Sequence, residues 1–152
     1  MQQPIVISGA GILGCYISCA LSLQGIDSIV LEKKDDEVED SVRTITLNPF
    51  SKNLLDKIGI ENDYSMINKM EVKDFDGTGK IVFKSREIGM DHLAYVSDFA
   101  TLLMAVRKKA SEKILYKEEI IDIDNKGDLN EVTLSSGKVI KTNLIISSDG
   151  KN

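Results

Sequence analysis

The stretch that decides the fold is PIVISGAGILG, residues 4–14. It joins a short apolar run to a glycine motif of the form G-x-G-x-x-G, which consists of Gly9, Gly11 and Gly14. Short apolar runs of this kind are typical of strands that are buried on both faces of a parallel sheet. We therefore predict a buried strand that ends at the glycine motif.

The residues after the motif predict a helix and a second strand. Residues 12–24 have apolar side chains at helical spacing, and Gly25 stands where a helix would end. Residues 28–31 (SIVL) form a second buried run, and Glu32 closes it. A strand, a helix and a strand in about 30 residues form a βαβ unit of a parallel sheet. The expected fold class is therefore α/β and Rossmann-like.

The three glycines match the requirements of a dinucleotide site. Gly9 permits a tight turn, Gly11 lets a pyrophosphate approach the backbone, and Gly14 allows close packing of helix and strand. The start of the helix offers N–H groups and a partial positive charge to the pyrophosphate. The alternative is a glycine-rich turn without a ligand, but the position between a strand and a helix favours a nucleotide site.

Glu32 follows the motif at the end of the second predicted strand. A carboxylate at this position accepts hydrogen bonds from the adenosine ribose and disfavours a 2′-phosphate, so NADP is not the expected ligand of this site. The alternative is an exposed carboxylate at the end of a strand. The glycines and Glu32 do not distinguish FAD from NAD by themselves.

The remaining sequence predicts a mixture of helices and strands. Helical patterns cover residues 48–58 and 98–113, and a hairpin covers residues 69–86. Residues 120–140 predict a β-meander, and residues 143–148 predict a last buried strand. A simple NAD-binding Rossmann module would instead continue with alternating strands and helices. The hairpin and the meander therefore argue against that alternative.

Composition limits the classes of function. The formal net charge of −5 argues against a nucleic-acid-binding protein, which would carry a basic surface. The chain contains neither a signal-peptide pattern nor an apolar stretch long enough to span a bilayer, and we expect a cytoplasmic protein. Cys15 and Cys19 are expected to be small buried thiols. With His92 as the only histidine, expected to be structural or exposed, we predict no metal site.

Three further segments carry a resemblance to a known family. They are RTITLNPFSKNLLDKIG at residues 43–59, YVSD at residues 95–98, and LIISSDG at residues 144–150. Together with the glycine motif, these segments resemble the flavoprotein aromatic hydroxylases of the para-hydroxybenzoate hydroxylase type. The similarity is greatest to the ubiquinone-biosynthesis monooxygenases. The glycine motif and the apolar strand that ends in Asp149-Gly150 are the most specific parts of the resemblance.

The resemblance implies that the cofactor is FAD, bound by Gly9, Gly11, Gly14, Glu32, Arg43 and Asp149. Arg43 would approach the flavin side of the cofactor, and Asp149 would lie near the pyrophosphate. The alternative for Arg43 is a surface arginine that balances the charge of Asp40. The alternative for Asp149 is a turn residue before Gly150. The role of Asp98 stays open. The resemblance also implies NAD(P)H as the reductant, O2 as a co-substrate and a small aromatic substrate such as a polyprenyl phenol.

The chain departs from the family after Asp149-Gly150. The family continues with a Ser and an Arg and later with a Gly-Asp motif, whereas this sequence ends at Asn152. We therefore expect residues 1–152 to be one incomplete FAD-binding domain, with 69–86 as the start of a substrate-binding sheet. We expect no catalytic side chain in it and no activity of the chain alone. A second chain could supply the missing part, and the full enzyme could associate peripherally with a membrane. The alternative is a non-catalytic or decayed fragment.

Overall fold

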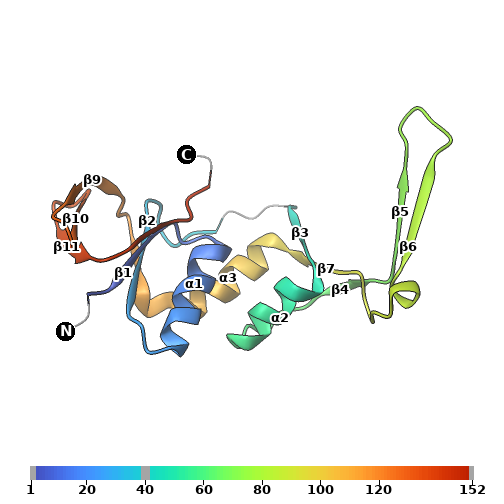
Figure 1. Ribbon diagram of the computed structural model, residues 1–152, viewed down its shortest axis with the longest axis horizontal. Helices are drawn as coiled ribbons and strands as arrows, with labels where there is room; N and C mark the ends of the chain where they lie inside the picture. The colour runs from blue at the N-terminus through green and yellow to red at the C-terminus, as the bar shows by residue number, and fades with distance from the viewer. Residues whose placement is uncertain (1–2, 39–41, 151–152) are drawn as a thin grey trace. The chain divides into compact units, whose positions relative to one another are not determined.

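The computed structural model describes residues 3–38 and 42–150 (Figure 1). The chain divides into two compact units. The first unit consists of Met1–Asp40 and Leu103–Asn152, and the second unit consists of Ser41–Leu102. The division falls within helix α3 (Phe99–Ala110), so this helix contributes residues to both units.

A parallel sheet forms the centre of the first unit. Its strands lie in the order β12-β1-β2-β8, and their bounds are Ile145–Ser147 (β12), Ile5–Ser8 (β1), Ser28–Glu32 (β2) and Ile114–Tyr116 (β8). Strand β1 is an inner strand, because Val6 pairs with Ile145 of β12 on one side and with Ile29 of β2 on the other. The predicted α/β fold with a parallel sheet is therefore confirmed.

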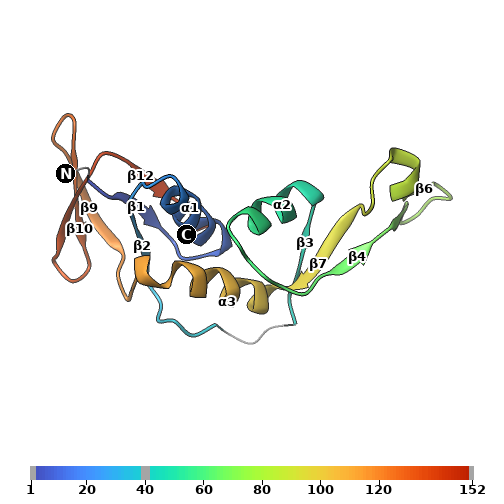
Figure 2. The same cartoon turned by 90° about the horizontal axis from the view of Figure 1, so that it is seen from below.

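Helix α1 (Ile12–Leu23) connects β1 to β2 and packs on both strands (Figures 1 and 2). Small side chains permit the close approach. The hydroxyls of Ser18 and Ser28 lie 2.8 Å apart in the buried contact between helix and sheet. Cys15 and Cys19 are buried and free on the same helix, as their spacing predicts.

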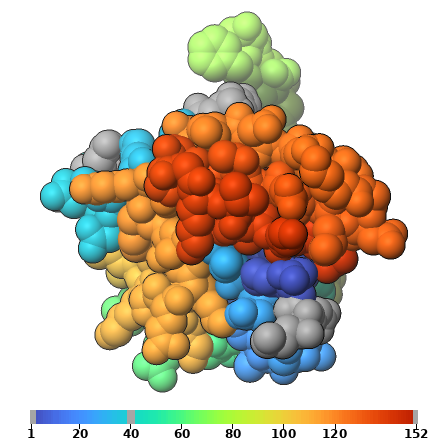
Figure 3. All heavy atoms as spheres, turned by 90° about the vertical axis from the view of Figure 1, so that its left-hand side faces the viewer, coloured from blue at the N-terminus to red at the C-terminus, as the bar shows by residue number. Residues whose placement is uncertain are grey.

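An antiparallel meander covers the opposite face of the sheet. It has the order β11-β10-β9, and its strands are β9 (Ile120–Asn125), β10 (Asn130–Leu134) and β11 (Val139–Thr142). Val6 and Leu31 of the sheet form one buried cluster with Val132, Leu134 and Ile140 of the meander. In Figure 3 the meander forms the orange and red part of this surface. The sheet is thus covered on both faces, which explains its continuous apolar strands.

The second unit contains a three-stranded antiparallel sheet in the order β3-β7-β4. The strands are β3 (Thr44–Leu47), β7 (Ala94–Asp98) and β4 (Ser65–Ile67). Helix α2 (Pro49–Lys57) contacts β3 and β7 (Figure 2). Asn48 caps this helix, since its Oδ1 accepts a hydrogen bond from the Ser51 N–H at 2.7 Å.

The second unit also contains the predicted hairpin. Strand β5 (Lys69–Lys73) pairs antiparallel with β6 (Lys80–Lys84), and a 3-10 turn, η1 (Ser85–Ile88), follows. Every residue of β5 is exposed. The hairpin is therefore a two-stranded ribbon without a buried face among the described residues.

The structure adds two strands that the sequence patterns do not predict, β3 and β4. Their sequences, TITL and SMI, contain polar residues and are mostly exposed, so they lack the continuous apolar run that marks the strands of the parallel sheet. The predicted helix at 98–113 stops at Ala110, and a 3-10 turn, η2 (Ser111–Lys113), continues it. Within the residues that the structure describes, no helix is long and apolar enough to cross a membrane.

Candidate cofactor-binding site

The candidate site lies at the carboxyl ends of β1, β2 and β12 in the first unit. Gly9, which directly follows β1, has a φ of +100°, a conformation that glycine adopts without strain. Its N–H donates to the Leu31 carbonyl oxygen at 2.8 Å. A Cβ atom at this position would lie 2.8 Å from the backbone Cα of Asp149. The turn therefore requires glycine for both conformation and space.

Gly14 requires glycine because helix α1 packs directly on this turn. A Cβ atom at Gly14 would collide with the carbonyl oxygen of Gly9 and would lie 2.6 Å from Ser148 Oγ. The Ser148 hydroxyl is itself within hydrogen-bond distance of the carbonyl oxygens of Ser8 (2.8 Å) and Gly9 (3.0 Å). The packing contact explains why the third glycine of the motif is at this position.

Gly11 differs from the other two glycines. Its φ is −73°, which any residue adopts, and a Cβ atom there would meet nothing within 4 Å. The described part of the chain thus gives no internal reason for a glycine. A ligand that approaches the backbone would give one, so the residues present fit a bound pyrophosphate.

Helix α1 begins directly after Gly11, which is its N-cap residue and has no side chain for capping. The first hydrogen bond of the helix runs from the Cys15 N–H to the Gly11 carbonyl oxygen at 3.0 Å. The N–H groups that precede Cys15 in the first turn have no partner within the helix, and the first turn holds no acidic side chain. This helix end can therefore bind an anionic group.

Glu32 is held by three donors at the end of β2. Its Oε2 accepts hydrogen bonds from the Ala10 N–H (3.2 Å) and from Arg107 Nη2 (3.1 Å). Its Oε1 accepts one from the Lys34 N–H at 3.1 Å. A carboxylate has about four acceptor positions, so Glu32 retains capacity for a further donor such as a ribose hydroxyl.

Arg107 is a site residue that the sequence patterns do not reveal. It lies on α3, and its Nε donates to the Ala10 carbonyl oxygen at 2.9 Å while its Nη2 binds Glu32. The side chains of Arg107 and Glu32 are only 11% and 13% exposed. Arg107 thus connects the glycine turn to the carboxylate at the end of β2.

A signal for Arg107 exists in the helical spacing of α3. Arg107 comes four residues after Leu103 and three before Ala110, and both of these residues are buried. A charged residue at a position that the period assigns to the core needs a partner, because burial of an unpaired charge is costly. The same guanidinium lies 5.7 Å from the centre of the Tyr116 ring.

Asp149 lies next to the glycine turn, just beyond β12. Its Oδ1 accepts a hydrogen bond from the Ser147 hydroxyl at 2.7 Å, and its Oδ2 accepts one from the Ser8 hydroxyl at 3.2 Å. The Ser147 hydrogen bond in particular lowers the pKa of Asp149, so its carboxylate is ionised at neutral pH. Gly150 follows with a φ of +83°, which also fits the alternative of a turn.

Arg43 is part of the second unit and is exposed. Its guanidinium lies 4.3 Å from the centre of the Phe99 ring, a cation–π contact. The alternative partner Asp40 is outside the described residues. The structure thus brings together Gly9, Gly11, Gly14, Glu32 and Asp149, and a role for Arg43 toward the flavin stays a prediction.

Two residues that the sequence leaves without a function have structural roles. Asp98 Oδ1 accepts a hydrogen bond from the Thr101 N–H at 2.7 Å and so caps α3. Cys15 is fully buried beneath the site, and burial raises the pKa of its thiol to about 12. Cys15 is therefore protonated and unreactive at neutral pH.

A parallel βαβ unit with this glycine turn, a strand-end carboxylate and an open helix N-terminus defines the dinucleotide-binding class of α/β domains. Comparison with known proteins specifies the family. The FAD binding domain family matches residues 2–151, and the chain belongs to this family. Relatives of the chain include the 3-hydroxybenzoate 6-hydroxylase 1 of Aquipseudomonas alcaligenes, which is 29% identical over 99% of this chain and 41% of that protein.

Two further relatives are similar to nearly the whole chain. The mitochondrial ubiquinone biosynthesis monooxygenase of Danio rerio is 26% identical over 97% of this chain. The 3-demethoxyubiquinol 3-hydroxylase of Escherichia coli (strain K12) is 26% identical over 99% of this chain. The matched regions are 36% and 42% of these two proteins, so the chain spans about two fifths of their length.

A solved structure confirms the fold. A variant of PqsL from P. aeruginosa superimposes with a TM-score of 0.81 at 20% sequence identity. The superposition covers 99% of this chain and 43% of the other.

Proposed function

We propose that the first unit binds FAD with the pyrophosphate at the start of α1, above Gly11, and with the adenosine ribose at Glu32. The convergence of Gly11, Glu32 and Asp149 at the carboxyl ends of neighbouring parallel strands carries this proposal, because nucleotides bind at that edge of open α/β sheets. The open space at Gly11 supports a close approach of the pyrophosphate.

Within this site, Arg107 is a positioning residue for Glu32. Its guanidinium holds Oε2, and its Nε holds the Ala10 carbonyl oxygen. Both bonds limit the movement of the glycine turn relative to the carboxylate. The Lys34 N–H adds a third constraint at Oε1. A ribose would thus meet a carboxylate that is already oriented, which reduces the entropy lost on binding.

We further propose that the full protein is a monooxygenase that hydroxylates an aromatic ring, with NAD(P)H as the reductant, in ubiquinone biosynthesis. The names of two relatives support this substrate class. Bound FAD would supply the electron transfer and the oxygen chemistry. The residues of this chain would bind and orient the adenine half of the cofactor, and none of them acts as a nucleophile.

In this proposal, the hairpin at residues 69–86 belongs to the substrate-binding part of the enzyme, which the rest of the protein completes. The chain spans about two fifths of its relatives, and the hairpin exposes an apolar face. We expect residues 1–152 alone to give no product. The remaining part would come from the same protein or from a second chain, and the complete enzyme would associate peripherally with a membrane.

The cofactor proposal is tested by calorimetric titration of the protein with FAD, with ADP and with NADP+. We expect FAD and ADP to bind and NADP+ to bind more weakly, because Glu32 repels a 2′-phosphate. Glu32→Ala should weaken FAD and ADP binding by about 1.5–3 kcal/mol, the value of a hydrogen bond to a charged group. Unchanged affinity for both nucleotides in this variant would contradict the ribose assignment.

A further inference from the structure

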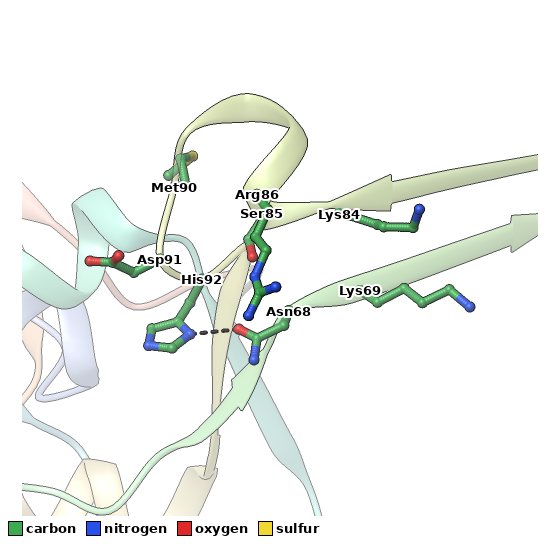
Figure 4. Close-up of a pocket in the computed structure, with 8 residues that line it drawn as sticks. All are labelled: Asn68, Lys69, Lys84, Ser85, Arg86, Met90, Asp91 and His92. Carbon is green, nitrogen blue, oxygen red and sulfur yellow. Dashed lines mark hydrogen bonds between the residues drawn. The ribbon is translucent and has the colours of Figure 1, made fainter.

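A pocket lies at the base of the β5–β6 hairpin, entirely within the second unit (Figure 4). Its volume is about 630 Å3, within the range of small-molecule sites. The lining residues come from the start of β5, the end of β6, the turn η1 and the segment before β7: Asn68, Lys69, Lys84, Ser85, Arg86, Met90, Asp91 and His92.

The lining is cationic in a chain of net negative charge. Three basic residues, Lys69, Lys84 and Arg86, line the pocket together with one acidic residue, Asp91. Lys84 Nζ lies 2.9 Å from Glu87 Oε1, and Lys69 Nζ lies 3.7 Å from Glu71 Oε2. Arg86 forms no ion pair with any residue in the described part of the chain. Its guanidinium therefore remains available to an external anion.

The side chains of His92 and Asn68 lie beside Arg86 and add hydrogen-bond donors. His92 Nδ1 and Asn68 Oδ1 are 2.6 Å apart, and because an amide oxygen only accepts, the imidazole donates. This arrangement leaves the Asn68 amide nitrogen to donate to another group. Figure 4 shows the Arg86 guanidinium directed toward the His92–Asn68 pair, while Lys69 and Lys84 extend along the hairpin.

Backbone bonds fix the walls of the pocket. The Ser85 N–H donates to the Asn68 carbonyl oxygen at 3.0 Å, and the Met90 N–H donates to the Ser85 carbonyl oxygen at 3.0 Å. The His92 ring also packs edge-to-face on Tyr95, with the ring centres 5.5 Å apart. The backbone walls of the pocket and the His92 ring are thus held in place before a ligand arrives, which reduces the entropic cost of binding.

We propose that this pocket binds the oxyanion group of a small organic molecule, a carboxylate or a phosphate. The planar guanidinium of Arg86 can donate two parallel hydrogen bonds to such a group. The Asn68 amide provides a neutral donor beside it. Met90 and the methylene groups of the two lysines offer apolar contact to the body of the ligand. The inference uses only residues of the second unit and does not rest on the FAD proposal.

His92 gives a direct readout, because it is the only histidine of the chain. Its imidazole ring gives a single set of NMR signals, which can be followed during titration of the protein with sodium benzoate, with inorganic phosphate or with sodium chloride at matched ionic strength. We expect a saturable shift with benzoate or phosphate and no saturable shift with chloride. Saturation by benzoate identifies a carboxylate site, and saturation by phosphate identifies a phosphate site.

Two variants separate a specific site from general charge. Arg86→Gln keeps most of the side chain but removes the charge, and the dissociation constant should rise at least about tenfold. Lys57→Gln removes an exposed charge of the same unit outside the pocket, and it should leave the dissociation constant unchanged. Equal responses to all three salts, or equal losses in both variants, would overturn the proposal.

Discussion

Apolar side chains are buried in the parallel sheet of the first unit but exposed to solvent in the β5–β6 hairpin of the second unit. Val6, Ile7 and Val30 of the sheet are 0% exposed. In the hairpin, Val72 is 48% exposed and Ile81 is 58% exposed, although they are directly paired across the strands. The sheet is therefore complete on both faces, whereas the hairpin presents an apolar face to solvent.

The other face of the hairpin is saturated by charges. Glu71 lies within 4 Å of three lysines, Lys69, Lys73 and Lys80. Hydrogen bonds from Lys80 and Lys73 lower the pKa of Glu71. An isolated two-stranded hairpin is marginally stable in water. In this ribbon the polar face is stabilised by ion pairs, whereas the apolar face is exposed to solvent. The comparison teaches that the parallel sheet is supported by packed side chains on its faces, whereas the apolar face of the β5–β6 strands has no such support among the described residues.

The largest effect is expected at Gly14. Gly14→Val would place a branched side chain against the Gly9 carbonyl oxygen and Ser148, both fixed by the sheet. We expect a loss of more than about 4 kcal/mol in the free energy of unfolding, or no folded first unit. Denaturant unfolding measures it. The control is Gly79→Val in the hairpin turn, where the nearest atom would be at 3.6 Å. Equal stabilities of the two variants would contradict the difference between the regions.

Gly11→Val separates binding from folding. Since a Cβ atom at Gly11 meets open space, the unfolding midpoint should stay near that of the parent. The side chain would occupy the position proposed for the pyrophosphate, so FAD uptake should be lost. Visible flavin absorbance after gel filtration measures the retained cofactor. A Gly11→Val protein that keeps FAD as well as the parent would show that the pyrophosphate lies elsewhere.

Arg107→Met should have an intermediate effect. It retains the apolar volume of the helix but leaves Glu32 without its cation, at 13% exposure. We expect a cost of about 2–4 kcal/mol in the free energy of unfolding, near the value for breaking a buried ion pair. Glu32→Gln in the same background should restore part of it, because no uncompensated charge remains. A double-mutant cycle by denaturant unfolding measures the coupling energy between Arg107 and Glu32. A coupling energy of zero would contradict the role of Arg107 as a positioning residue for Glu32.

The smallest effect is expected in the hairpin. Phe83→Lys replaces a side chain that is 47% exposed on the apolar face, opposite Met70. The free energy of unfolding should change by less than about 0.5 kcal/mol, as for surface positions in general. Self-association, measured by light scattering, should decrease because the exposed apolar surface shrinks. A large loss of stability would mean that this face is already covered within the chain.

The two regions also differ in how well sequence reasoning describes them. The βαβ unit follows from local patterns, since the apolar runs, the spacing of the glycines and the position of Glu32 after the second run are all visible within residues 4–32. The partner of Glu32 cannot be predicted from local patterns, because Arg107 lies on a helix 75 positions further along the chain. Strands β3 and β4 were missed because their pairing with β7 is decided by tertiary contacts rather than by their own composition.

The hydrogen bonds of the Ser148 hydroxyl to Ser8 and Gly9 affect the order in which the site folds. They connect the end of β12 to the carbonyl oxygens at the glycine turn across a sequence separation of 139–140 residues. Contacts of such high contact order form late, because the long loop between them must first be closed. During synthesis from the N-terminus, the glycine turn emerges from the ribosome well before the strand that completes it. The nucleotide pocket is therefore assembled only after β12 has been made, although its signature is among the first residues translated.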